Sequence, residues 1–105
     1  MPTTADHLWH DIAETQLPLS GVTSGTGFGR NAGLRIGGKI FAMLVGGELV
    51  VKLPKDRVDE LVASGAARRF EPGTGRVMKE WASVPTTSSR RWRALADDAR
   101  TFVGG

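Results

Sequence analysis

The chain has 105 residues, of which 40% are hydrophobic and 24% are charged, and its formal net charge is +3. This length suits a single domain over residues 1–105, and the absence of cysteine excludes a disulfide scaffold, a thiolate nucleophile and a zinc–thiolate site. The longest apolar run, Ile40 to Val45, is too short to cross a bilayer, and no signal peptide opens the chain, so we expect a soluble, cytoplasmic protein.

The N-terminal segment predicts a helix over Thr4–Gln16. A threonine at position 3 or 4 can cap the first free amides, and Asp6 suits the positive end of the helix. The next stretch, Ser20–Asn31, is rich in Gly, Ser and Thr, which is typical of a loop. This loop is expected to lead to a short extra strand near Phe28.

Two pairs of adjacent glycines divide the middle of the chain into strands. Adjacent glycines accept the positive φ angles of tight hairpins, so the pattern predicts an antiparallel meander. The predicted strands and turns are Gly33–Ile36, Gly37-Gly38, Lys39–Val45, Gly46-Gly47 and Glu48–Leu53.

The C-terminal half predicts a helix, a hairpin and a last helix. The first of these helices starts at Pro54 and ends at Gly65, and the last helix is expected to be capped by Ser88 or Ser89. The hairpin joins Arg68–Glu71 to Val77–Val84. The order α-β(3)-α-β(2)-α predicts an α+β fold with an antiparallel sheet of about five strands and three helices.

Several segments, taken in order, resemble the TfoX N-terminal domain family, which is related to YjbR-like domains. The resemblance implies an α+β fold similar to secretion chaperones, a bacterial domain like those of competence regulators, and no established catalytic residues. It is carried by Gly33–Leu44, Leu49–Leu53, Phe70–Trp81, Val84 and the closing helix.

Positive charge gathers toward the end of the chain. Residues 1–20 contain three acidic side chains and no Lys or Arg, whereas residues 68–105 contain eight basic and four acidic side chains. Arginine binds phosphate well, and the interleaved Trp81 and Trp92 could stack on unpaired bases. A solvated basic surface is the simpler interpretation. The arginines that would contact nucleic acid are Arg68, Arg69, Arg90, Arg91 and Arg93.

The meander predicts an unusually apolar second face. With a two-residue Gly46-Gly47 turn, Ala42 and Leu44 lie on the face that the helices cover, and Phe41, Met43 and Val50 lie on the other. An open sheet face of this kind is expected to be covered by a partner. We therefore predict that Phe41, Met43 and Val50 contact a partner protein, most simply a second copy in a homodimer.

A two-residue turn at Gly37-Gly38 would add Leu34 and Ile36 to this second face. A three-residue bulged loop would place Arg35 there instead.

Other motifs favour neither an enzyme nor a cofactor. A dinucleotide-like Gly27-x-Gly29-x-x-Ala32 lacks the preceding buried strand and following helix that such a site requires. His7 and His10 share one helix with Asp11 and Glu14 but fall short of a known zinc motif, so no metal site is expected. No serine or cysteine nucleophile lies in a recognisable setting.

Three hypotheses for the function follow. The first is a non-catalytic binding or regulatory module that acts through protein contacts. The second is a weak nucleic-acid binder that uses the C-terminal arginines. The third is a small-ligand protein or enzyme with a pocket near the Gly25–Gly33 loop.

Overall fold

The computed structural model describes residues 3–26, 32–71 and 78–105, so the expected strand near Phe28 and the turn at 72–75 lie outside the described residues. Within these ranges the chain forms three α-helices, one 3-10 helix (η1) and six strands. In chain order they are α1 (Thr4–Gln16), β1 (Val22–Thr26), β2 (Ala32–Ile36), β3 (Lys39–Val45), β4 (Glu48–Lys52), α2 (Lys55–Ala63), β5 (Arg68–Phe70), β6 (Met78–Val84), η1 (Thr86–Arg91) and α3 (Trp92–Gly104). No helix in these segments has the length and apolar character of a membrane span.

The strands form one antiparallel sheet in the order β1-β2-β3-β4-β6-β5. The predicted meander is confirmed, because Ile36 pairs with Lys39 and Val45 with Glu48 across two-residue glycine turns. Gly37 has a φ angle of 57° and Gly46 one of 56°, which side chains with a Cβ rarely adopt. The α+β class is confirmed, with six strands in the described residues instead of about five.

The additional strand is β1, which lies inside the segment predicted to be a loop. Its five residues pair with β2 along their whole length, from Val22 opposite Ile36 to Thr26 opposite Ala32. A Cβ atom on Gly25 would lie only 2.7 Å from Arg35 Nε, so glycine at this position lets the arginine lie across the strand. Tertiary pairing therefore overrides a composition that is typical of loops.

The helix boundaries follow the predicted capping signals in two of three cases. Thr3 caps α1 in a capping box with Asp6, and the hydrogen bond from the Thr3 backbone is the main cause that lowers the pKa of Asp6. Helix α2 begins after Pro54, and Gly65 follows it with a φ of 79°. The prediction of a Ser88 or Ser89 cap is wrong, because both residues lie within η1 and α3 begins only at Trp92.

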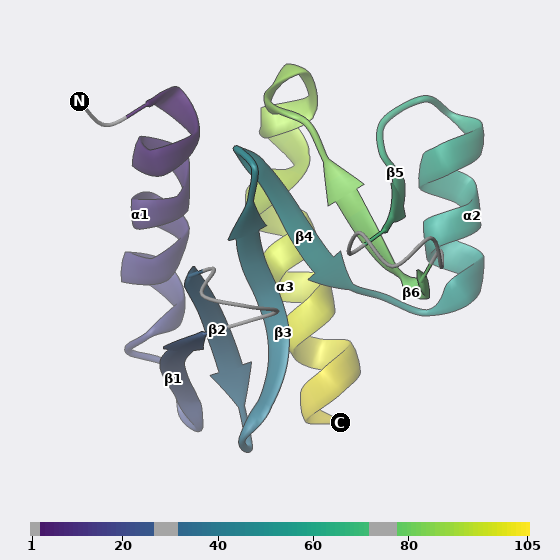
Figure 1. Ribbon diagram of the computed structural model, residues 1–105. Helices are drawn as coiled ribbons and strands as arrows, with labels where there is room; N and C mark the ends of the chain where they lie inside the picture. The colour runs from purple at the N-terminus through teal and green to yellow at the C-terminus, as the bar shows by residue number, and fades with distance from the viewer. Residues whose placement is uncertain (1–2, 27–31, 72–77) are drawn as a thin grey trace.

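All three α-helices contribute to one hydrophobic cluster on one face of the sheet. In Figure 1, α3 runs behind β3 and β4, α1 lies on the β1–β2 side, and α2 lies beside β5 and β6. The predicted covering of this face by the helices is confirmed. The largest fully buried side chains of this cluster are Trp92, Phe41, Ile12, Leu34, Leu49, Leu53 and Leu95.

A β-bulge in β3 changes which face Phe41 occupies. Leu34 pairs with Ala42 and Arg35 with Ile40, so Phe41 is an extra residue without an opposite partner on β2. Phe41 and Ala42 consequently both belong to the cluster beneath the helices. A two-residue Gly37-Gly38 turn was expected to place Leu34 on the second face. The turn does have two residues, but the bulge moves Leu34 to the helix-covered face.

The second face of the sheet has a hydrophobic cluster of its own. Met43 pairs with Val50 as predicted, and these two side chains are buried together with Phe70 and Trp81. Phe41, Met43 and Val50 each have 0% of their surface exposed within the single chain. The predicted partner surface is therefore wrong, because a second chain cannot reach these three side chains.

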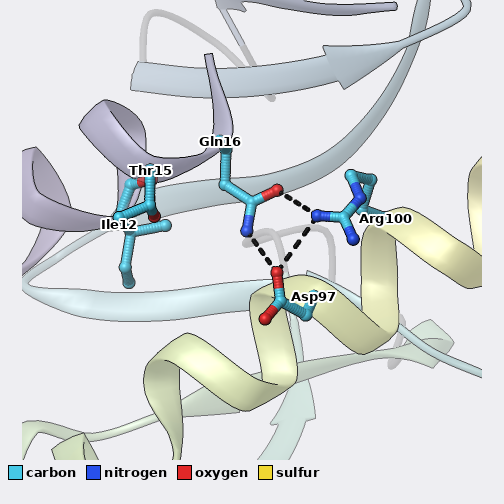
Figure 2. A network of polar contacts seen from close by, with 5 residues as sticks. All are labelled: Ile12, Thr15, Gln16, Asp97 and Arg100. Carbon is cyan, nitrogen blue, oxygen red and sulfur yellow. Dashed lines mark hydrogen bonds and ion pairs between the residues drawn. The ribbon is translucent and has the colours of Figure 1, made fainter. Parts of the chain in front are cut away.

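A polar network joins the end of α1 to α3 (Figure 2). Gln16, which is buried, donates a hydrogen bond from Nε2 to Asp97 Oδ1 at 2.7 Å and accepts one from Arg100 Nη1 at 2.9 Å. Arg100 Nη1 also donates to Asp97 Oδ1 at 3.1 Å, which closes the triangle. A buried amide with both its donor and its acceptor satisfied fixes the position of α1 against α3.

We predict that Met43→Glu unfolds the domain or lowers its free energy of unfolding by about 4 kcal/mol or more, because it buries an unpaired carboxylate. Urea denaturation followed by tryptophan fluorescence measures this change. Leu19→Glu, at a side chain that is 41% exposed, is the matched control and should change stability by no more than about 0.5 kcal/mol. A folded Met43→Glu variant with a wild-type midpoint would contradict the burial described above.

We further predict that Gln16→Ala lowers the free energy of unfolding by about 1–3 kcal/mol, since it removes two partly buried hydrogen bonds. Hydrogen exchange should accelerate at the amides of α1, whereas those of β3 and β4 keep their relative protection. Glu14→Ala, on the exposed side of the same helix, serves as the control. Equal acceleration in α1 and in the sheet would show that the network does not act locally.

Candidate functional site

The five arginines expected to contact nucleic acid are divided between two parts of the fold. Arg68 and Arg69 lie on β5, at the edge of the sheet. Arg90 and Arg91 end η1, and Arg93 lies in the first turn of α3. Figure 1 shows η1 at the same end of the sheet as the turn between β3 and β4.

Arg69 forms an ion pair with Asp59 inside the fold. Its Nη2 atom lies 2.7 Å from Asp59 Oδ1, and Lys55 Nζ donates to the other oxygen of Asp59 at 2.8 Å. The hydrogen bond from Lys55, and then the Arg69 guanidinium, lower the pKa of Asp59 below its ordinary value of 3.8. Arg69 thus joins β5 to α2.

Arg68 takes part in a three-residue polar contact on the second face. Glu48 Oε1 accepts hydrogen bonds from Ser83 Oγ at 2.6 Å and from Arg68 Nη2 at 3.0 Å. Ser83 is buried and the Glu48 side chain is 22% exposed, whereas the Arg68 side chain is 73% exposed. The buried Ser83 hydroxyl therefore fixes the Glu48 carboxylate from inside the protein, and the exposed Arg68 side chain contacts it from the solvent.

Arg90, Arg91 and Arg93, which we call the arginine cluster, have no ion pair or side-chain hydrogen bond to any residue in the described part of the chain. All three are exposed. Arg90 and Arg91 line a hollow of about 310 Å³ together with Thr87 and Ser88, which we call the η1 hollow. Two guanidinium groups and two hydroxyl groups at one concave surface form a donor set suited to the oxygen atoms of an anion.

The arginine cluster lies where η1 passes into α3. The N-terminal end of a helix carries a partial positive charge, which favours acidic side chains there, and the C-terminal end favours basic ones. Helices α1 and α2 follow this rule with Asp6 and Asp56 in their first turns, whereas α3 has no acidic residue in its first turn. Arg90 and Arg91 follow the rule, because they lie in the last turn of η1.

The two tryptophans expected to stack on bases are inside the protein. Trp92 is 1% exposed, and its indole donates to the carbonyl of Pro85 at 3.2 Å. Trp81 is 5% exposed and belongs to the second-face cluster. Neither ring is therefore available to stack on an unpaired base, and the burial of Trp92 agrees with its place at the start of the apolar stripe of α3.

The described residues give little support to a metal site on α1 or to a pocket near the Gly25–Gly33 loop. His10 Nε2 lies 2.9 Å from Glu14 Oε1 on an exposed face of α1, and the described residues bring together no set of three His, Cys, Asp or Glu ligands. Gly25 pairs with Gly33 between β1 and β2, but residues 27–31 of the proposed pocket loop lie outside the described residues.

A larger hollow, of about 400 Å³, lies between α2 and α3. Its walls include Leu53, Pro54 and the exposed Phe102, and Arg57 Nη2 lies 3.7 Å from Asp98 Oδ2 beside them. The two charges are already paired with each other. The apolar wall is accessible, and no free charge beside it would select an ionic ligand among the residues that line this hollow.

Sequence reasoning identified the arginines and missed the groups around them. Glu48 pairs with Val45, but its contacts with Ser83 and Arg68 depend on the β4-β6-β5 strand order. Ser88 was expected only as a possible helix cap, and Thr87 had no predicted role. The density of hydroxyl and arginine residues over 86–91 was the one available signal.

Comparison with known proteins finds no match to any protein-family model, to any curated protein or to any solved structure. The assignment of the site therefore rests on its geometry alone.

We predict that the contribution of Asp59 to stability disappears in acid. Because its native pKa lies below 3.8, the stabilisation is fully present above that pH and is lost as the pH falls through the native pKa. The difference in free energy of unfolding between wild type and Asp59→Asn should be constant near neutrality and should shrink below pH 3.8. Repeating the series in 1 M salt should reduce the difference at neutral pH; a difference that grows in acid would contradict this account.

Proposed function

We propose that the domain is a non-catalytic binding module whose arginine cluster contacts the phosphate backbone of nucleic acid. The observation that carries this proposal is the set of three exposed arginines, unpaired among the described residues, around the η1 hollow and the start of α3. Arginine forms paired, charge-assisted hydrogen bonds with phosphate oxygens, and the nearby hydroxyl groups add further donors.

The grouping of these charges supports an anionic ligand. Arg90, Arg91 and Arg93 are close together in the sequence and exposed, so their guanidinium groups repel one another, and a bound phosphate replaces part of that repulsion by attraction. Water and salt screen exposed charges, so this contribution is small and decreases as the salt concentration rises.

The proposed recognition is independent of base sequence. With Trp81 and Trp92 buried, the site offers guanidinium and hydroxyl groups to the backbone and no aromatic surface to the bases. Affinity should therefore depend on salt concentration much more than on sequence. Binding of this type is weak at physiological ionic strength, so the module would act beside other contacts.

The hypothesis of a module acting through protein contacts is second. Its apolar surface, Phe41, Met43 and Val50, is buried, so a protein partner would have to use another part of the molecule. The resemblance to TfoX N-terminal domains, the competence-related role that it implies and a cytoplasmic location remain proposals beside the nucleic-acid function.

We predict that Arg90→Glu combined with Arg91→Glu abolishes detectable binding of a fluorescein-labelled, single-stranded oligothymidylate at low salt, because phosphates then meet two carboxylates. Fluorescence anisotropy measures the affinity. Stability should change by no more than about 0.5 kcal/mol, since both side chains are exposed and unpaired among the described residues.

The matched control is Lys39→Glu combined with Lys79→Glu, which changes the net charge equally. Both lysines are exposed; Lys39 follows the β2–β3 turn and Lys79 lies at the start of β6, at the end of the sheet away from η1 (Figure 1). This variant should lose only a small part of the affinity. No binding by the wild type, or equal losses in the two double variants, would refute a specific role for the arginine cluster.

A further inference from the structure

A second hollow lies beside the Glu48–Arg68 ion pair and extends to the start of η1. It measures about 230 Å³ and is lined by Glu48, Gly65, Ala67, Arg68 and Pro85, and we call it the Arg68 hollow. Pro85 is the residue on which η1 begins. The Arg68 hollow therefore borders η1 at its first end, whereas Arg90 and Arg91 of the η1 hollow are the last two residues of η1.

The length of η1 sets the span of a ligand that would occupy both hollows. Six residues of 3-10 helix extend at most about 12 Å, at roughly 2 Å per residue, and the kink at Ser88 shortens this span. Successive phosphates of one strand are about 3.4 Å apart along a stacked helix and farther apart in an unstacked single strand. A ligand that reaches from the Arg68 hollow to Arg90 and Arg91 therefore carries more than one phosphate.

Glu48 already forms an ion pair with Arg68, the residue that such a ligand would contact. Its Oε1 atom accepts a hydrogen bond from Arg68 Nη2 at 3.0 Å and a second one from the buried Ser83 hydroxyl at 2.6 Å. Because the Arg68 side chain is 73% exposed, its ion pair is screened by water and can be replaced by another anion. Glu48 itself cannot leave without breaking its bond to Ser83.

We propose that Glu48 is an internal competitor for Arg68 and thereby a specificity-determining residue. Short phosphate ligands bind at the arginine cluster and leave the Glu48–Arg68 pair closed. Longer ones reach the Arg68 hollow, where a phosphate replaces Glu48 as the partner of Arg68. This inference rests on the proposed function, and it specifies the ligand as a polyanion long enough to span η1.

The test uses Glu48→Gln, which keeps the shape and the oxygen that accepts from Ser83 and removes the charge. The ligands are labelled oligothymidylates of two and of twelve nucleotides, measured by anisotropy over a salt series. Glu48→Gln should bind the twelve-nucleotide ligand about 3- to 10-fold more tightly than wild type, and the salt slope should steepen by about 0.7, the value for one more phosphate contact on a single strand. Affinity for the two-nucleotide ligand should not change.

Two controls separate this effect from a change in net charge. Glu60→Gln removes one carboxylate from α2, where its side chain is 70% exposed, and should leave both affinities unchanged. Glu48→Gln combined with Arg68→Gln should lose the gain, because the proposed effect passes through Arg68. A gain that survives the loss of Arg68, or one that Glu60→Gln reproduces, overturns the inference.

Arg68→Gln alone keeps the proposal testable if Glu48→Gln does not fold. This exposed substitution should weaken binding of the twelve-nucleotide ligand several-fold and leave the two-nucleotide ligand unaffected. If Arg68→Gln and Glu48→Gln both bind like wild type, and Arg90→Glu with Arg91→Glu still abolishes binding, the role of Glu48 is wrong and the proposed function stands. If neither wild type nor Glu48→Gln binds the longer ligand, the proposed function itself is wrong.

Discussion

The single extra residue in β3 determines how the two faces of this sheet are filled. Phe41 has no partner on β2, so both Phe41 and Ala42 lie beneath the helices and every residue of β2 changes face relative to a regular pairing. Leu34 thereby joins the main cluster, and Met43 remains on the other face with Val50. The bulge therefore supplies large side chains to the first face without emptying the second.

The charged residues divide between those that hold the fold and those that face the solvent unpaired. Asp97 and Arg100 fix α1 through Gln16, and Asp59 with Arg69 joins α2 to β5. The contact of Gln16 with Asp97 links residues 81 positions apart in the sequence, whereas the pair of Asp59 with Arg69 joins two consecutive elements of the chain. The arginine cluster makes no ion pair within the described residues. This difference between paired and unpaired arginines is the basis of the functional proposal.

Local signals in the sequence predicted local structure well. The α1 helix runs over the predicted Thr4–Gln16, and the glycine pairs specified both turns of the meander. The bulge at Phe41 and the pairing of β1 have no local signature, because each depends on a neighbouring strand. The same limit applies to the site: Arg68 and Arg69 look equivalent in the sequence, and only the strand order shows that one meets Glu48 and the other Asp59.

The two outermost strands bear on how the domain behaves at high concentration. An unpaired strand edge is a template for intermolecular strand addition, and proteins resist such aggregation with short or charged outer strands. Strand β1 is five mostly polar residues, and β5 is only three residues long, two of them arginines. Two arginines on so short an outer strand disfavour the addition of a further strand at this edge, although both faces of the sheet are apolar.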